Sequence, residues 1–243
     1  AVATASKDYT YYEGLAAYTD GDNFDKALAE EYKAAAIDEL TAAGATFPIK
    51  MLMCYNPTSA NWAQECQVVE QQIETVLGAD YVDIIIQAGP ETGFLGAIRR
   101  TGKYAFMKCN WGADYADPET WTDPFSTDSS YSFIFKSTDP ETQALYAEYT
   151  ELVAAAKAIT DDMDARYTAF AKAEAFLLDH AFAVPFSISN RSYQMCNLNV
   201  FEGQYASFGL ANQRYKDQHL YSSSMGMEEY QAAYAEWQSK KAG

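Results

Sequence analysis

Residues 108–118 read Lys-Cys-Asn-Trp-Gly-Ala-Asp-Tyr-Ala-Asp-Pro. This stretch decides the predicted fold, because a predicted buried strand, residues 103–110, ends within it. A glycine after a strand lets a ligand backbone approach, a tryptophan offers an apolar wall, and an aspartate offers a fixed anion. Trp111, Gly112 and Asp114 are therefore candidate ligand-binding residues. The structural alternative places Trp111 in the core and makes Asp114 the cap of the helix that follows.

Upstream of this turn, helices and strands alternate. In chain order the pattern predicts helix 24–43, strand 49–55, helix 59–77, strand 81–87, helix 90–101 and strand 103–110. Asp22 or Asn23 can cap the first helix, Gly44 and Gly78 can end the first and second, and Pro90 suits the first turn of the third. This order favours an α/β sheet whose strand ends carry the site.

Downstream, the pattern is mainly helical. Thr138-Asp139-Pro140-Glu141 has the form of a capping box and predicts a helix to about residue 159, and residues 160–162 cap a second helix to about residue 180. Residues 183–193 are strand-like, and residues 228–240 predict a terminal helix. Because no repeat or low-complexity linker interrupts residues 20–205, they are expected to form one compact unit.

The composition is that of a folded domain. Of the 243 residues, 49% are hydrophobic and 15% aromatic, which is enough for a substantial core. The 34 acidic and 17 basic residues give a net charge of -17, so nucleic acid is a poor partner. No apolar run approaches the roughly 20 residues that span a bilayer, and the N-terminus lacks the pattern of a secretion signal.

The sequence carries no signature of an enzyme, a metal site or a cofactor. Its two histidines, His180 and His219, stand outside any metal-binding pattern, and no P-loop, G-x-S-x-G elbow or G-x-G-x-x-G occurs. The cysteines form no C-x-x-C pair, so they indicate neither zinc nor a redox centre, and their three possible disulfide connectivities stay open. These cysteines are Cys54, Cys66, Cys109 and Cys196.

The sequence resembles the periplasmic oligopeptide- and dipeptide-binding proteins, family 5 of the solute-binding proteins of ABC importers. The most specific part is the Trp-Gly-Ala-Asp-Tyr-x-Asp-Pro element of residues 111–118. The likeness also covers the helix of residues 24–44, the helix ending Val76-Leu77-Gly78, Gly102-Lys103-Tyr104, and residues 179–188 with their Val-Pro-Phe. The resemblance implies that this chain is the C-terminal lobe of a bilobed α/β protein. This lobe would comprise domain III and the crossover segment, with a mixed sheet flanked by helices.

The resemblance also implies which residues bind the ligand. Asp114 stands where such receptors pair an acid with the α-ammonium group of a peptide, and the strand end at residues 110–112 pairs with the ligand main chain. Two basic side chains would meet the carboxylate end, and an aromatic ring near the crossover would line the pocket. Lysine at position 108 lacks the planar fork of arginine, which leaves the peptide length open. The full set is Asp114, Trp111, Asn110, Gly112, Lys108, Arg99 and Tyr205.

The expected biology follows from the same resemblance. Residues 1–20 would connect to an N-terminal lobe missing from this chain, residues 21–205 would form the ligand-binding lobe, and residues 206–243 would cross back. The whole protein would capture peptides outside the cytoplasm by hinge closure, deliver them to the importer's permease, and touch the membrane only through that permease or a lipid anchor. A single lobe is expected to bind weakly. Three alternatives remain open. The same fold could bind an oligosaccharide or a nickel complex, or the chain could be an enzyme or a structural surface domain.

Overall fold

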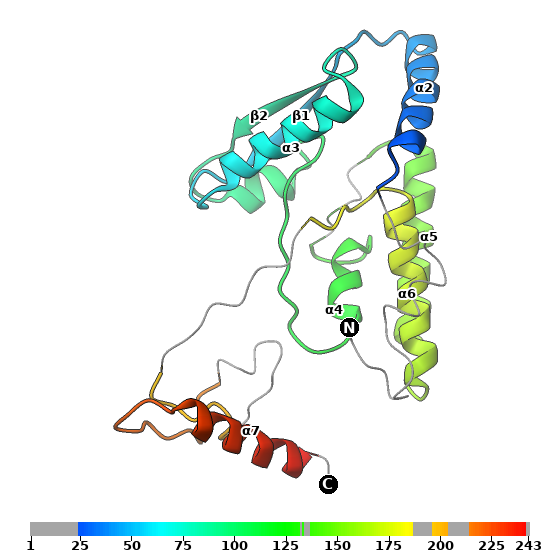
Figure 1. The fold of residues 1–243 in the computed structure, drawn as a ribbon. Helices are drawn as coiled ribbons and strands as arrows, with labels where there is room; N and C mark the ends of the chain where they lie inside the picture. The colour runs from blue at the N-terminus through cyan, green and yellow to red at the C-terminus, as the bar shows by residue number, and fades with distance from the viewer. Residues whose placement is uncertain (1–23, 132, 134–136, 187–195, 204–213, 242–243) are drawn as a thin grey trace. The chain divides into compact units, whose positions relative to one another are not determined.

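The computed structural model describes residues 24–131, 133, 137–186, 196–203 and 214–241 (Figure 1). The chain forms two compact units, one of residues 1–110 and 122–182 and the other of residues 111–121 and 183–243. The domain boundaries expected at residues 20 and 205 lie outside the described residues, so they stay a prediction.

The sheet of the first unit is a parallel pair of strands, β1 (Ile49–Tyr55) and β2 (Val82–Ala88), joined through helix α3 (Trp62–Leu77) (Figure 1). The register runs from Ile49 opposite Val82 to Tyr55 opposite Ala88. Parallel neighbours cannot be joined by a tight turn, and α3 supplies the crossover and packs on the strands. The core beneath α3 contains Met53, Cys66, Val82 and Ile84. Both strands and this helix are confirmed where the sequence predicts them, and so is the α/β class.

The predicted C-terminal ends of the first two helices are confirmed, whereas the predicted N-cap of the first helix is wrong. Helix α2 (Lys26–Ala42) is capped by Asp25, whose carboxylate accepts a hydrogen bond from the Leu28 amide at 3.0 Å. Gly44 follows with a φ of 83° and Gly78 ends α3 with a φ of 92°, a region that costs glycine little. The cap is thus neither Asp22 nor Asn23.

Three further predictions are wrong in the described part of the chain. No helix runs from Pro90 to residue 101: Gly93 has a φ of 69°, and only a single π-helical turn, η1 (Leu95–Arg99), follows it. Residues 103–110 form no strand, because only Phe106 bridges β1, at Met53. Residues 183–186 are not in a strand either, and residues 187–193 lie outside the described part.

Helices α5 (Pro140–Ala158) and α6 (Met163–Asp179) pack side by side in the first unit, as the short loop between them favours (Figure 1). The cap of α6 is as predicted, since Asp162 accepts from the Ala165 amide at 2.9 Å. The cap of α5 differs from the predicted capping box, because the N-cap is Asp139, which accepts from the Thr142 amide at 2.8 Å. The residues buried between and around them are Tyr146, Tyr149, Val153, Ala156, Tyr167, Phe170, Ala171, Ala173, Ala175 and Leu177.

Arg166 ties the two helices together at their connecting loop. Its guanidinium is buried and donates to three carbonyl oxygens at the end of α5, those of Ala156, Lys157 and Ile159, at 3.2, 3.1 and 3.0 Å. Carbonyls at the end of a helix carry the negative end of its dipole, and of these three the Ala156 carbonyl also accepts from the Ile159 amide at 3.3 Å. A buried cation is therefore balanced by backbone dipoles, and the same contact fixes the path of the loop.

The second unit contains helix α7 (Met227–Lys241), which the sequence predicted over residues 228–240. Phe201 is buried against three aromatic rings of this helix, those of Tyr230, Tyr234 and Trp237, with centroids 5.0, 5.4 and 6.1 Å away. The helix is otherwise largely exposed. Within the described part of the chain, no helix is long and apolar enough to cross a membrane.

We expect Arg166→Met to lower the free energy of unfolding by about 2 to 3 kcal/mol, because charged hydrogen bonds are lost and the carbonyls of α5 are left buried. Urea denaturation measures this change. Arg100→Met is the matched control, since Arg100 is exposed and its loss should cost within about 0.5 kcal/mol. Equal costs for the two substitutions would contradict the anchoring role of Arg166.

Candidate functional site

The turn after residue 110 is organised by Thr120. The Thr120 carbonyl accepts a hydrogen bond from Nε1–H of Trp111 at 2.6 Å, and its hydroxyl accepts one from the backbone N–H of Asp114 at 3.2 Å. Thr120 itself is buried, which protects both bonds from water. The turn is thus closed by two bonds to one residue, and the backbone at Asp114 is fixed.

The structure separates the roles of the two aspartates in this turn. Asp117 is the helix cap, because its Oδ1 accepts from the amide of Glu119 at 2.9 Å at the start of α4 (Glu119–Thr122). Asp114 is exposed, and its carboxylate caps no helix in the described part of the chain. The structural alternative is therefore wrong for Asp114, and Trp111 is only partly buried. A Cβ built on Gly112 meets no atom within 4 Å, so space is open beside that backbone.

Arg99 lies at the end of η1 and is 8% exposed. Its guanidinium covers the ring of Phe133 at 4.6 Å from the centroid, and one NH group donates to the sulfur of Cys109 at 3.5 Å. Its Nε has no acceptor, and Arg99 pairs with no carboxylate among the residues that the structure describes. A ring and a thiol compensate only part of the charge of a buried cation, so this guanidinium is suited to binding an anion.

Lys108, the second predicted basic residue, has a partner within its own unit. Its ammonium forms an ion pair with Glu65 in the first turn of α3 and stands 5.4 Å from the ring centroid of Trp62. Trp62 in turn meets the edge of buried Phe94 at 6.1 Å. This group lies beyond the carboxyl end of β1, where ligand sites form in α/β folds. A ligand carboxylate would have to share Lys108 with Glu65.

The predicted site residues therefore fall into two groups. Arg99, Lys108 and Asn110 belong to the first unit, whereas Trp111, Gly112 and Asp114 belong to the second. Asn110 is exposed but does not end a strand, so the strand-end geometry assigned to it is wrong. Tyr205 lies outside the described residues. No sequence signal pointed to Phe133 or Thr120, because both act through contacts that only the fold creates.

The comparisons with known proteins agree with the resemblance noted above. The chain is 30% identical over 235 residues to oligopeptide-binding protein AmiA of Streptococcus pneumoniae, an overlap of 90% of this chain and 35% of AmiA. It is 31% identical over 239 residues to AliA of the same organism and 27% identical over 234 residues to SarA of Streptococcus gordonii, again covering 90% of the chain. The chain is homologous to oligopeptide-binding proteins. It spans about a third of the length of these curated relatives.

The fold is also similar to that of a protein of known structure. A crystal structure of the peptide-binding protein of a peptide ABC transporter superposes with a TM-score of 0.50 at 24% identity, covering 64% of this chain and 62% of that one. At this identity the likeness shows the fold alone. No family model matches the chain.

The cysteines differ in access and in ionisation. Cys54 and Cys66 are buried and Cys109 is exposed, and none of the described cysteines is in a disulfide. Burial raises the pKa of Cys54 and Cys66. Packing around its sulfur also raises the pKa of Cys109, although the Arg99 guanidinium opposes this change. In the described part, no cluster of three or more His, Cys, Asp or Glu side chains could hold a metal ion.

We predict that iodoacetamide modifies Cys109 before Cys54 and Cys66, because only Cys109 is exposed. The thiolate is the reacting form, and a raised pKa lowers its fraction at pH 7, so the Cys109 rate should keep rising as pH passes the ordinary thiol pKa. Peptide mass mapping at a series of pH values measures both effects. A Cys109 rate that is already maximal at pH 7 would contradict the direction of the pKa shift.

Proposed function

We propose that this chain is part of the solute-binding component of a peptide ABC importer, and that it captures peptides outside the cytoplasm for delivery to the permease. The observation that carries the proposal is the homology to oligopeptide-binding proteins over 90% of the chain. Such a receptor binds and releases its ligand by domain closure and performs no chemical step. Its remaining parts, a second lobe and an attachment to the membrane, belong to the same proposal.

Asp114 is the proposed partner of the peptide's α-ammonium group. Its carboxylate is exposed, while its backbone is held by Thr120 and its neighbour Asp117 serves the helix. The side chain is thereby available on a fixed segment of backbone. A carboxylate–ammonium hydrogen bond is charge-assisted, and it recognises a terminus that every free peptide shares.

Arg99 is the proposed contact for the anionic end of the ligand. Its cation is already desolvated, so little additional hydration is lost when a carboxylate arrives. The ring of Phe133 fixes the plane of the guanidinium, and a planar fork matches a carboxylate. Lys108 is the weaker candidate for this role because Glu65 already neutralises it.

The first test titrates the complete polypeptide that carries this chain with a pool of short peptides, using isothermal titration calorimetry. We expect Asp114→Asn to raise the Kd about tenfold or more, since a hydrogen bond to a charged group contributes about 1.5 to 3 kcal/mol. N-acetylation of the pool should weaken wild-type binding to a similar extent and have little further effect on the variant.

The control for Asp114→Asn is Glu228→Gln, which removes an exposed carboxylate from the same unit and should leave the Kd unchanged. If acetylated and free peptides bind equally well, Asp114 does not receive the ammonium group. If no peptide binds at all, the peptide ligand is wrong and the fold serves another solute.

The role of Arg99 is tested with peptides whose C-terminus is amidated. We expect amidation to raise the wild-type Kd about tenfold, because the ligand loses the carboxylate that the guanidinium binds. Arg99→Lys keeps the charge and loses the fork, and it should bind free and amidated peptides with nearly equal affinity. Amidated peptides that bind wild type as tightly as free ones would exclude this role for Arg99, whether or not the variant folds.

A further inference from the structure

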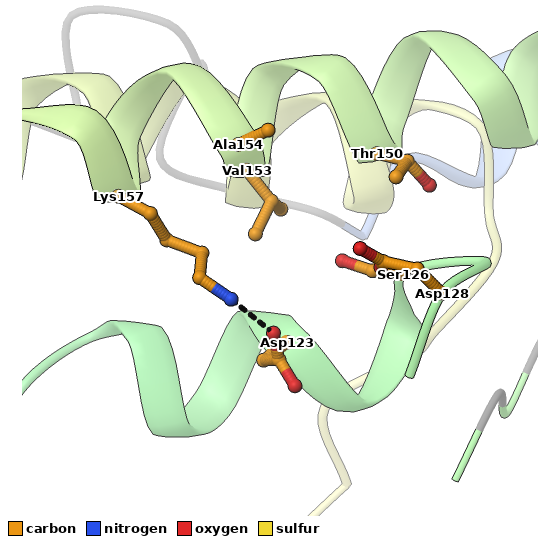
Figure 2. A pocket seen from close by; sticks show the side chains of 7 residues that line it. All are labelled: Asp123, Ser126, Asp128, Thr150, Val153, Ala154 and Lys157. Atoms are coloured by element: carbon orange, nitrogen blue, oxygen red, sulfur yellow. Dashed lines mark hydrogen bonds and ion pairs between the residues drawn. The ribbon is translucent and has the colours of Figure 1, made fainter. Parts of the chain in front are cut away.

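A small cavity lies between α5 and the segment that follows the 3-10 turn η2 (Asp123–Phe125) (Figure 2). Its volume is about 190 Å³. Water occupies about 30 Å³ per molecule in the liquid, so the cavity has room for a solute of a few heavy atoms. The lining residues are Asp123, Ser126, Asp128, Thr150, Val153, Ala154 and Lys157, all in the first unit.

The hydroxyl of Ser126 is the unusual group in this cavity. Ser126 is 1% exposed, and its Oγ has no hydrogen-bond partner among the residues that the structure describes. A buried hydroxyl without a partner costs free energy, and nearly all such groups in proteins are satisfied. Figure 2 shows Ser126 beside Asp128, facing the same space as the Lys157–Asp123 pair. The cavity therefore offers a polar group that needs a partner.

The charges around the cavity do not balance. Lys157 donates to Asp123 Oδ1 at 2.8 Å, which neutralises that carboxylate. Asp128 is exposed and has no ion pair among the described residues, so one negative charge remains. The hydroxyl of Thr150 is already engaged, since it donates to the Tyr146 carbonyl at 2.9 Å and accepts from the Thr127 amide at 3.0 Å. The groups left to serve a ligand are the Asp128 carboxylate, which accepts hydrogen bonds, and the Ser126 hydroxyl, which can accept as well as donate.

We propose that this cavity binds a small organic primary ammonium ion, with Asp128 as its counter-ion and Ser126 Oγ as an acceptor. A primary ammonium offers several N–H donors to these oxygens, and Val153 and Ala154 form an apolar wall for a short alkyl group. A divalent metal would need more ligands, because calcium takes six to eight oxygens and one of the two carboxylates is held by Lys157. The site is independent of the proposed peptide-receptor function.

The test titrates the complete polypeptide that carries this chain with ethylammonium and follows backbone amide signals by NMR. We expect a saturable shift at Ser126 and Asp128 in the millimolar range, and Asp128→Asn should raise the Kd about tenfold. Asp128 is exposed, so its variant should fold normally. Asp161→Asn, which removes an exposed carboxylate from the loop between α5 and α6, is the matched control and should leave the Kd unchanged.

Two further titrations fix the chemistry of the ligand. Tetramethylammonium carries the same charge without an N–H donor and should give no saturable shift at Ser126. Potassium, a cation without hydrogen-bond donors, should not compete with ethylammonium beyond its effect on ionic strength. The proposal is overturned if ethylammonium shows no saturation, if either cation binds with the same Kd, or if the Asp161 variant weakens binding as much as the Asp128 variant.

Discussion

The parallel pairing of β1 with β2 is the constraint on which the first unit depends. Two parallel neighbours need a long crossover, and this requirement places α3 over the sheet and brings the ends of both strands to one edge. The Gly89 amide donates to the carbonyl of Tyr55 at 2.9 Å and extends the pairing just beyond β2. A Cβ at Gly89 would lie 2.6 Å from the ring of Phe94, so the chain turns there under a buried aromatic side chain. The first turn of α3 and its ion pair with Lys108 are placed by this same geometry.

The two buried arginines show how one residue type can serve stability or recognition. Arg166 donates to three carbonyl oxygens at the end of a helix, so the protein itself satisfies its charge. Arg99 is equally buried, at 8% exposure, yet the partners of its guanidinium among the described residues are a ring and a thiol, both weak partners for a cation. Burial alone does not distinguish them, whereas the acceptors around each guanidinium do. The incomplete environment of Arg99 is what makes it a candidate for binding an external anion.

The sequence predicts the elements that apolar periodicity and caps determine, and it fails where a distant partner or the backbone conformation of one residue decides. Strands β1 and β2 and the helices α3, α5, α6 and α7 follow from apolar periodicity, and the cap Asp162 follows from residue type and spacing. Residues 103–110 have strand-like composition, but a strand also needs a partner along its length, and only Phe106 has one. The helix expected from Pro90 fails because Gly93 adopts a positive φ that breaks the helical path.

The candidate site, like the fold, is only partly predictable from the sequence. The composition of the glycine-containing turn singles out Asp114, whereas Arg99 is singled out only by the resemblance to oligopeptide-binding proteins. Their functional character is not visible there: Asp114 is left exposed because Asp117 takes the cap and Thr120 binds the backbone, and Arg99 is left incomplete because Phe133 is its neighbour. A receptor for peptides of varied sequence needs fixed charges for the two termini and little else. Under the proposed function, Asp114 and Arg99 would each supply one such charge, the first from the second unit and the other from the first unit.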